Sequence, residues 1–379
     1  MKIIYVTTTI DADDYKSFVS LWSKKPNPSN QNFHNKVIRA LAKTNEVEVV
    51  SIRPFSRKLM SIKALAKEDK QIDGIKWHYL PIKGNKLTRF ISIKREAKKV
   101  FKKGELDDAI ILTDTININC MNVATMLSKR AKRPVVGICT DSPSNITGTL
   151  KSYTMYLLKK ASKLDGYIAL TSELNTLFND ANKPHLIIEG IVENINQNTK
   201  KDGDTPYFFF GGSLSPRYGI NALIEGFLAL NRKDIKLVVA GHSGILKDYP
   251  NVEFKGVLDV KDVLKYEANA IANINPRPYS EDLDRFSIPS KTIEYLTSGV
   301  PTISVRNSKL NPYFKDEIYW VEDSTPECFK KALEDILNMK EEERAYWGNR
   351  AKEKVLELFS MDQVGNKISY FLSTFLNKK

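Results

Sequence analysis

Hydrophobic residues in this chain occur as short continuous runs and at helix-spaced positions, and the two arrangements alternate along most of its length. The first run, Lys2 to Thr9, predicts a buried strand. The segments Ser29 to Lys43 and Val47 to Ile52 predict a helix and a second strand. The polar segment Asp11 to Pro28 predicts a long loop between them. Long loops after the carboxyl ends of parallel strands are where α/β proteins bind ligands.

The alternation continues and divides the chain into two α/β halves. Further strands of the first half are predicted at Ile75 to Leu80, Ala109 to Leu112, Val135 to Cys139 and Gly166 to Leu170, and the half ends with Leu186 to Glu189. Those of the second half are predicted at Tyr207 to Phe210, Lys236 to Ala240, Ala270 to Asn275, Pro301 to Val305 and Ile318 to Val321. The polar segment Glu193 to Thr205 predicts a linker. We therefore expect Rossmann-like parallel-sheet domains at residues 1–190 and 206–360.

The last helix, predicted over Met361 to Leu376, follows a complete α/β half and carries an apolar face of its own. That face consists of Val364, Ile368, Phe371, Leu372 and Phe375. An apolar helix face has to be buried against another element. We expect residues 361–379 to cross back and pack on the first domain.

Charge is distributed unevenly between the halves. The 379 residues carry a formal net charge of +13, with 33 Lys and Arg against 19 Asp and Glu in residues 1–200 and 25 against 26 in residues 201–379. A basic first half favours an anionic partner, such as a membrane surface, a phosphorylated acceptor or nucleic acid. The nucleic-acid interpretation rests on charge alone, without a base-stacking motif or a recognition helix, so no nucleic-acid partner is expected.

The three cysteines and four histidines are scattered without the spacing of a metal site, so no metal is expected. The sparse, odd set of cysteines indicates a reducing compartment. The N-terminal run lacks the features of a secretory signal, and no segment approaches the roughly 20 apolar residues that a membrane span needs. These features predict a cytoplasmic protein.

Residues 84–103 form the most basic helix candidate. One face carries Phe90, Ile93, Ala97, Val100 and Phe101, and the opposite face carries Lys94, Arg95, Lys98, Lys99, Lys102 and Lys103. One interpretation is an amphipathic helix packed on a sheet, with its lysines in water. The other is a face that docks on an anionic membrane or a lipid phosphate. The sequence leaves both open.

The stretch Phe286 to Pro301 combines features of a phosphate and ribose site. Ser290 is predicted to cap a helix of about two turns. Lys291 adds a charge where free backbone N–H groups and the helix dipole already favour an anion. Glu294, one turn later, can accept two hydrogen bonds from a ribose diol. The alternative is an ordinary capped helix between a loop and a strand.

Two other loops carry candidate chemistry. Gly212 and Ser213 follow a buried strand and lead through Arg217 into a helix, an arrangement that cradles anions. Arg217 can hold a phosphate through two hydrogen bonds. In the first half, Asp141 follows the strand Val135 to Cys139, where it is a candidate for catalysis or a turn aspartate.

Five segments of the second half resemble the nucleotide-sugar domain of the family 4 (group 1) glycosyltransferases. They are GGSLSPRYGI (211–220), VVAGHSG (238–244), EFKG (253–256), NINPRP (273–278) and FSIPSKTIEYLTSGVPTI (286–303), in the family's order. The last form resembles enzymes of bacterial capsule, exopolysaccharide and O-antigen assembly, and KKPNPSNQNFHNKVIRAL (24–41) resembles the first helix region of that subgroup. The resemblance implies the GT-B fold, in which an acceptor-binding and a nucleotide-sugar-binding domain face a cleft.

Residue roles follow by position. Glu294 matches the second glutamate of the family's Glu-x7-Glu pattern, which binds the donor ribose, but the first glutamate is replaced by Phe286. The nearby acids able to substitute are Glu281, Asp282 and Asp284. The family's two basic diphosphate ligands are replaced by Ser213 and Tyr218, which leaves Arg217 and Lys291 as cations. The resemblance thus implies a donor site made of Gly212, Ser213, Arg217, Gly241, Val257, Arg277, Ser290, Lys291 and Glu294.

The function that the resemblance implies is a hexosyltransferase-type glycosyltransferase that makes cell-surface glycans. A UDP- or GDP-linked sugar is the expected co-substrate, with retention of configuration and no cofactor or metal. The acceptor is expected to be lipid-linked or a polysaccharide, at the inner face of the cell membrane. Catalysis is assigned to Arg217, Lys291 and Asp141, and acceptor or membrane contacts to His34, Lys94, Lys98, Lys99 and Lys102. The alternative is a catalytically inactive partner of an active glycosyltransferase, motivated by Phe286, Ser213 and Tyr218.

Overall fold

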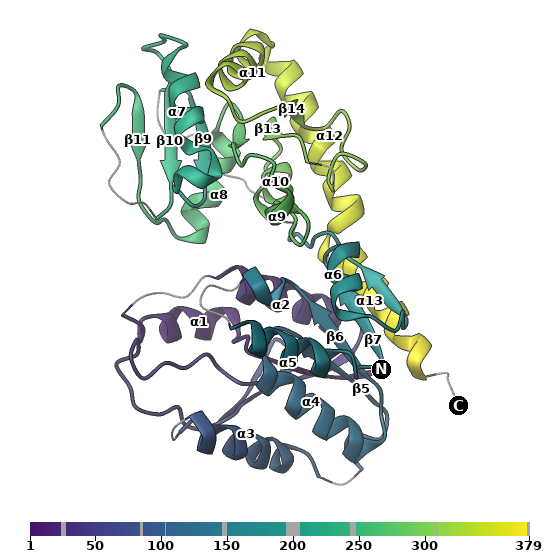
Figure 1. Ribbon diagram of the computed structural model, residues 1–379. Coiled ribbons are helices and arrows are strands. Elements are labelled where there is room, and N and C mark those ends of the chain that lie inside the picture. The colour runs from purple at the N-terminus through teal and green to yellow at the C-terminus, as the bar shows by residue number, and fades with distance from the viewer. Residues whose placement is uncertain are drawn as a thin grey trace. The chain divides into compact units, whose positions relative to one another are not determined.

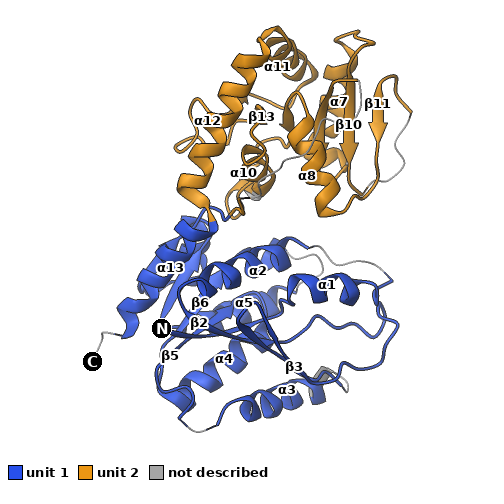
Figure 2. Cartoon of the chain, turned by 180° about the vertical axis from the view of Figure 1, so that it is seen from behind, with its two compact units in different colours: residues 1–191, 361–379 blue, residues 192–360 orange. Residues whose placement is uncertain are grey.

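The computed structural model describes the chain apart from residues 24–27, 84–85, 103, 146–149, 195–204, 243–247, 308 and 377–379. It divides into two compact units, which Figures 1 and 2 show as separate α/β bodies. Unit 1 consists of residues 1–191 and 361–379, and unit 2 consists of residues 192–360. Each unit is built on its own largely parallel sheet, so the expected fold class is confirmed.

Unit 1 contains an eight-stranded sheet of order β3-β4-β2-β1-β5-β6-β7-β8. Its strands are β1 Lys2–Thr7, β2 Glu46–Ser51, β3 Glu68–Ile72, β4 Ile75–Tyr79, β5 Ala109–Asp114, β6 Val135–Cys139, β7 Gly166–Ala169 and β8 His185–Ile187. Neighbouring strands are parallel except β3, which pairs antiparallel with β4. The apolar runs form the central strands because helices cover the sheet, as is typical of parallel sheets.

The helices of unit 1 are α1 Ala12–Val19, α2 Ser29–Ala42, α3 Lys86–Val100, α4 Ile118–Ala131, α5 Lys151–Ala161, α6 Ser172–Phe178 and α13 Met361–Leu376, with a 3₁₀ turn at Pro143–Asn145. The expectation of a continuous loop from Asp11 to Pro28 is therefore wrong. Asp11 caps α1 by accepting a hydrogen bond from the Asp13 N–H (3.0 Å), and Phe18 is buried. A capping aspartate and a buried aromatic residue both stabilise this short helix.

Helix α13 packs on α2 within unit 1, which is where the sequence places it. Val364, Ile368 and Leu372 of its predicted apolar face are buried, whereas Phe371 and Phe375 are partly exposed. Gly365 allows the two helices to approach closely, because an added Cβ would lie 2.8 Å from the Ala40 carbonyl oxygen.

Unit 2 contains a six-stranded parallel sheet of order β11-β10-β9-β12-β13-β14. Its strands are β9 Tyr207–Gly211, β10 Lys236–Ala240, β11 Val252–Phe254, β12 Asn273–Asn275, β13 Thr302–Val305 and β14 Tyr319–Val321. Its helices are α7 Ile220–Leu228, α8 Val260–Asn269, α9 Glu281–Asp284, α10 Ser290–Leu296, α11 Pro326–Asn338 and α12 Glu341–Phe359, with a 3₁₀ turn at Pro216–Tyr218. The strand order reverses at β9, between β10 and β12. In open α/β sheets such a switch point leaves a crevice at the carboxyl ends of the strands.

Among the described residues, no helix combines the length and hydropathy needed to cross a bilayer.

A cluster of charges joins β1, β2 and β4 of the unit 1 sheet. Glu48 in β2 is 5 % exposed, and its carboxylate lies 2.8 Å from Lys2 Nζ, 3.2 Å from Lys76 Nζ and 3.1 Å from His78 Nε2. The hydrogen bond with His78 and the two ammonium groups lower the pKa of Glu48 from 4.5 to about 2, against the opposing effect of burial. The cluster therefore stabilises the folded state only while Glu48 is ionised.

Glu48→Gln is expected to lower the free energy of unfolding of unit 1 by about 2 kcal/mol at pH 7. Because the pKa is lower in the folded state, this contribution is complete above pH 4.5 and is lost as the pH falls towards about 2. Urea unfolding, followed by hydrogen exchange of peptides from β1 and β2 at pH 7 and pH 3, measures it. The matched control is Glu46→Gln, because that side chain is 56 % exposed in the same strand. An equal difference between wild type and Glu48→Gln at both pH values would contradict the assignment.

Candidate active site

A cavity of ≈ 140 Å³ opens in unit 2 where β9 and β12 end. It is lined by Phe210, Gly212, Ser213, Tyr218, Asn275, Arg277, Ile288, Pro289, Ser290 and Lys291. These residues come from the glycine turn after β9, the loop after β12 and the start of α10. The cavity therefore lies at the switch point of the sheet, and five of the predicted donor residues line it: Gly212, Ser213, Arg277, Ser290 and Lys291.

The glycine turn is held in place by α10. The Gly211 N–H donates to Tyr295 Oη (2.9 Å), and the same hydroxyl donates to the Gly211 carbonyl oxygen (3.1 Å). Tyr295 is fully buried, and burial raises its pKa, so the hydroxyl stays protonated and able to donate. Gly241 packs directly against the glycine turn, because a Cβ at residue 241 would lie 1.8 Å from the Gly212 carbonyl oxygen. These contacts fix the backbone that lines the cavity.

The start of α10 differs from the sequence prediction in one respect. Ser290 is an exposed residue of the first helical turn, and Pro289 occupies the N-cap position without a side-chain hydrogen bond. The prediction that Ser290 caps the helix is therefore wrong. The turn begins one residue earlier because the Pro289 carbonyl oxygen accepts the hydrogen bond from the Thr292 N–H (3.0 Å). Both Pro289 and Ser290 line the cavity.

Lys291 and Glu294 form an ion pair on α10. Lys291 Nζ lies 2.8 Å from Glu294 Oε2, and the two side chains are 40 % and 33 % exposed. Burial disfavours the charged form of Lys291, but Glu294 and the buried Glu267 on α8 outweigh it and raise the pKa. Lys291 is therefore a permanent cation at neutral pH, beside a carboxylate able to accept hydroxyl hydrogen bonds. Lys291 can bind an anion and Glu294 can bind a diol, and the two residues are three positions apart on the same helix.

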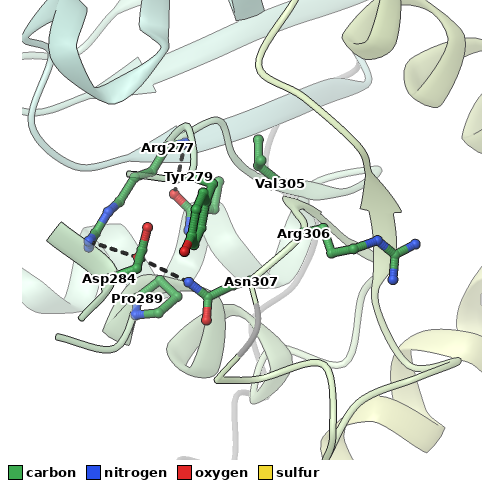
Figure 3. A pocket seen from close by; sticks show the side chains of 8 residues that line it. Arg277, Tyr279, Asp284, Pro289, Val305, Arg306 and Asn307 are labelled. Atoms are coloured by element: carbon green, nitrogen blue, oxygen red, sulfur yellow. Dashed lines mark hydrogen bonds and ion pairs between the residues drawn. The ribbon is translucent and has the colours of Figure 1, made fainter. Parts of the chain in front are cut away.

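Arg277 lines the cavity but is also an internal anchor. Its Nη2 donates to Asp284 Oδ1 (3.0 Å) and Ser287 Oγ (3.1 Å). Figure 3 shows Asp284 between Arg277 and Asn307, whose Nδ2 donates to the same carboxylate oxygen (3.0 Å). Asp284 is 3 % exposed and also accepts the Ser280 N–H, so these contacts exclude it as a replacement sugar ligand. The side chain of Asp282 lies outside the described residues.

Three other predicted donor residues, Arg217, Gly241 and Val257, are not among the residues that line the cavity. Arg217 is an exposed residue of the 3₁₀ turn. Its neighbour Tyr218 lines the cavity. The Gly241 N–H donates to the Gly256 carbonyl oxygen (2.7 Å), which joins the loops after β10 and β11. Val257 follows and is 66 % exposed. The Phe286 ring lies 5.1 Å from the Arg285 guanidinium.

Asn275 is a site residue that the sequence interpretation missed. It ends β12, lines the cavity, and donates from Nδ2 to Thr292 Oγ1 (2.7 Å) on α10. Phe210, Ile288 and Pro289 supply apolar walls. A polar residue at the carboxyl end of a buried run is a signal for Asn275. The apolar lining residues have no such signal.

The predicted role of His34 is corrected by its burial in unit 1. His34 is 0 % exposed, its Nδ1 lies 2.5 Å from Tyr5 Oη, and its Nε2 lies 3.6 Å from Asp114 Oδ2. Burial lowers its pKa, with Asp114 acting in the opposite direction. A side chain enclosed in this way cannot contact an acceptor, so that prediction is wrong.

Asp141 follows β6 at the carboxyl edge of the unit 1 sheet. It accepts hydrogen bonds from the Ser142 N–H (2.7 Å) and Asn145 Nδ2 (3.1 Å), which tie it to the 3₁₀ turn. Burial raises its pKa, and these two hydrogen bonds oppose the shift. The structure thus gives Asp141 the contacts of a turn aspartate, and its catalytic role stays a prediction.

Helix α3 has the burial pattern of an amphipathic helix and packs against α4. Ile93, Ala97 and Phe101 of its predicted apolar face are buried, and Phe90 and Val100 are partly buried. Lys94 Nζ lies 4.8 Å from the Phe90 ring centroid, and Lys99 pairs with Glu96 at 3.0 Å. Lys98 and Lys102 are exposed, and Lys103 lies outside the described residues. The membrane interpretation of these lysines stays a prediction.

Unit 2 is similar in sequence to a known family, and the whole chain is similar in fold to solved structures. Residues 191–354 match the model of the family Glycosyl transferases group 1, and no curated protein matches the sequence. Similar solved structures include sucrose-phosphate synthase from Thermosynechococcus elongatus (TM-score 0.71, 12 % identity, 100 % of both chains). An α,α-trehalose-phosphate synthase (UDP-forming) from Burkholderia xenovorans, in complex with glucose-6-phosphate, gives a TM-score of 0.68 at 9 % identity, covering 98 % of this chain and 100 % of that one. HepE from Anabaena in complex with UDP-glucose gives a TM-score of 0.62 at 12 % identity, covering 99 % of this chain and 100 % of that one.

At these identities the structural matches establish the fold, which is GT-B as the resemblance implied. The family match covers nearly all of unit 2, including the cavity, the glycine turn and α10. Unit 2 is therefore the part of the chain that is similar to the group 1 glycosyltransferases.

Proposed function

We propose that this chain, through its group 1 glycosyltransferase domain, transfers a sugar from a UDP- or GDP-linked donor to a lipid-linked or polysaccharide acceptor in cell-surface glycan synthesis. The observation that carries the proposal is the Lys291–Glu294 pair beside the cavity at the switch point of unit 2. Diphosphate and ribose are the anion and the diol that such a pair binds. The UDP-glucose bound in HepE supports a UDP-linked donor.

In the proposed reaction the bond between the anomeric carbon and the diphosphate oxygen breaks. The acceptor hydroxyl oxygen bonds to the same carbon, and its proton passes to the departing phosphate oxygen. Lys291 stabilises the charge that develops on the diphosphate, and the backbone N–H groups of the glycine turn support it. Glu294 holds the ribose hydroxyls and thereby aligns the donor. Retention of configuration, without metal or cofactor, is part of the proposal.

Unit 1 is proposed to bind the acceptor and an anionic bilayer at the cytoplasmic face. Its basic excess supports this, because a lipid-linked acceptor with a diphosphate and an anionic membrane both carry negative charge. Asn30 and Thr140 form a polar edge near the end of β6, where Thr140 Oγ1 donates to Asn30 Oδ1 (2.9 Å). These two residues replace the buried His34 as candidates for acceptor contact.

Calorimetry with UDP and GDP, followed by a nucleotide-release assay on a panel of donors with lipid extract as acceptor, tests the proposal. Wild type is expected to bind one nucleotide and to release it from one donor. Glu294→Ala is expected to weaken nucleotide binding by about tenfold or more, because hydrogen bonds to a charged group are lost. Glu353→Ala, an exposed glutamate on α12, is the control. No binding of either nucleotide, or binding unchanged by Glu294→Ala, would refute the proposal.

The inactive-partner alternative predicts a different result in the same assay. Tyr218 lines the cavity where the family has a basic ligand, and Phe286 stands in place of a glutamate. A chain that binds a nucleotide yet releases none from any donor, with lipid acceptor present, would favour that alternative.

A further inference from the structure

Helix α5 and the residue before it expose large apolar side chains on the surface of unit 1. Leu150, immediately before the helix, is 72 % exposed, and Met155 and Tyr156 are 64 % and 47 % exposed. The opposite side of the helix is buried through Leu157 and Ala161, which anchor it in unit 1. Because α5 is firmly packed on one side, the exposed residues are a fixed feature of the surface of unit 1.

Lysines flank these apolar residues along the helix, and the segment itself carries no acidic residue. Residues 150–163 contain Lys151, Lys159, Lys160 and Lys163 but neither Asp nor Glu. Lys151, Met155 and Lys159 follow one another at intervals of four residues, so they lie in one row along the exposed face. The ring of Tyr156 lies 6.0 Å from Lys160 Nζ. The apolar side chains are therefore interleaved with positive charge.

We propose that α5 docks unit 1 on an anionic lipid bilayer, with Leu150, Met155 and Tyr156 entering the boundary between headgroups and acyl chains. An interfacial helix buries separate apolar side chains at this depth, while its lysines meet the lipid phosphates. Tyr156 has the amphipathic ring that settles at the headgroup level. The complementary charge of the four lysines identifies an anionic surface as the occupant.

Helix α3 fits this role less well than α5, although it carries more basic residues. Its apolar side chains face the protein, and Ile91 is the large hydrophobic residue of α3 that is exposed (62 %) among those described. Glu96 neutralises part of its charge through Lys99 and Arg95. Helix α4 lies between α3 and α5 and contacts both (Figure 1). Docking through α5 therefore leaves α3 as a contributor of long-range attraction.

The position of α5 suits delivery of a membrane-bound substrate. The helix follows the 3₁₀ turn that begins two residues after Asp141, at the carboxyl edge of the unit 1 sheet. That edge is where α/β sheets bind ligands. This part of the inference rests on the proposed function, because it assumes a lipid-linked acceptor. Docking itself is measured without donor or acceptor, so its failure is distinguishable from a failure of sugar transfer.

Co-sedimentation of the full chain with vesicles tests the docking. One vesicle set is phosphatidylcholine alone, and the other is phosphatidylcholine with phosphatidylglycerol in a two-to-one ratio. Wild type is expected to bind the anionic set and to be released by salt. Met155→Glu with Tyr156→Glu is expected to lower the partition coefficient at least about tenfold. Lys159→Glu with Lys163→Glu provides a second variant that leaves every apolar side chain in place.

Tyr370→Glu is the matched control, because Tyr370 is a 77 % exposed aromatic residue on α13 of the same unit. It is expected to bind vesicles as wild type does. Four results would overturn the proposal: no binding by wild type, binding unchanged in both α5 variants, an equal loss in Tyr370→Glu, or a loss confined to Lys94→Glu with Lys98→Glu. Light scattering that shows wild type as a dimer and the α5 variants as monomers, with vesicle binding unchanged, would assign the patch to a second copy instead.

Discussion

Lys291→Met is expected to lower kcat/KM for the nucleotide-sugar donor by about 10²- to 10³-fold, the usual effect of removing one charge-stabilising group from a transition state. Methionine keeps the approximate length and apolar stem of the side chain but removes the ammonium group of a residue that lines the cavity. The bond to the diphosphate breaks with a gain of negative charge on the leaving oxygen, so most of the loss is expected in kcat. Initial rates of nucleotide release measure it.

Two further lysine or arginine variants are compared with Lys291→Met. Lys331→Met removes an exposed lysine from α11 of the same unit and is expected to leave the rates unchanged. Arg217→Met removes the other predicted cation, which is exposed, and a smaller effect than that of Lys291→Met is expected. If Arg217→Met had the larger effect, the diphosphate would lie nearer the 3₁₀ turn than the start of α10.

The Lys291–Glu294 pair also predicts coupling between the two side chains. Without a donor Lys291 Nζ lies 2.8 Å from Glu294 Oε2, so removing the lysine takes a cation away from a partly buried carboxylate. Donor binding gives each group a new partner, a phosphate for Lys291 and a ribose for Glu294. The pair thus keeps both charges compensated in the empty site, which limits the cost of holding them beside a cavity.

The fold was predictable wherever a single stretch of sequence carries its own signal. Continuous apolar runs predicted β1, β5, β6 and β9, because strands buried on both faces need such runs. The polar strand β3 was missed because EDKQI has no apolar pattern. Its signal is the Asp73-Gly74 pair, whose φ values of 50° and 79° form a tight hairpin turn into β4.

The site was predictable where its chemistry is local and unpredictable where it depends on contacts across the fold. Lys291 and Glu294 are three residues apart on one helix, so their proximity follows from helix geometry. Tyr295 bonds Gly211 across 84 residues, and no local pattern indicates that contact. His34 looked available on a polar helix, yet it is enclosed by Tyr5 and Asp114 from two neighbouring strands. Burial of this kind is set by strand order, which the residues around His34 do not encode.

Gly219→Ala is expected to destabilise unit 2 by about 3 kcal/mol and to weaken nucleotide binding at the same time. Gly219 has a φ of 78°, and a Cβ there would lie 2.0 Å from the Pro276 carbonyl oxygen. That oxygen accepts a hydrogen bond from Ser324 Oγ (2.8 Å), which the methyl group would also meet. Relief of the clash has to move Pro276, and Asn275 and Arg277 on either side of it line the cavity. Urea unfolding and calorimetry with UDP and GDP measure the two effects.

Gly256→Ala separates the clash from the backbone strain. Gly256 has a φ of 65°, similar to that of Gly219, but a Cβ there would meet no atom within 4 Å. This variant is therefore expected to lower the free energy of unfolding of unit 2 by about 1 kcal/mol, the cost of a left-handed conformation in a residue with a side chain. Equal losses in the two variants would show that strain alone acts and that the Pro276 loop tolerates displacement. A larger loss in Gly219→Ala with unchanged nucleotide binding would show that the loop after β12 does not shape the donor site.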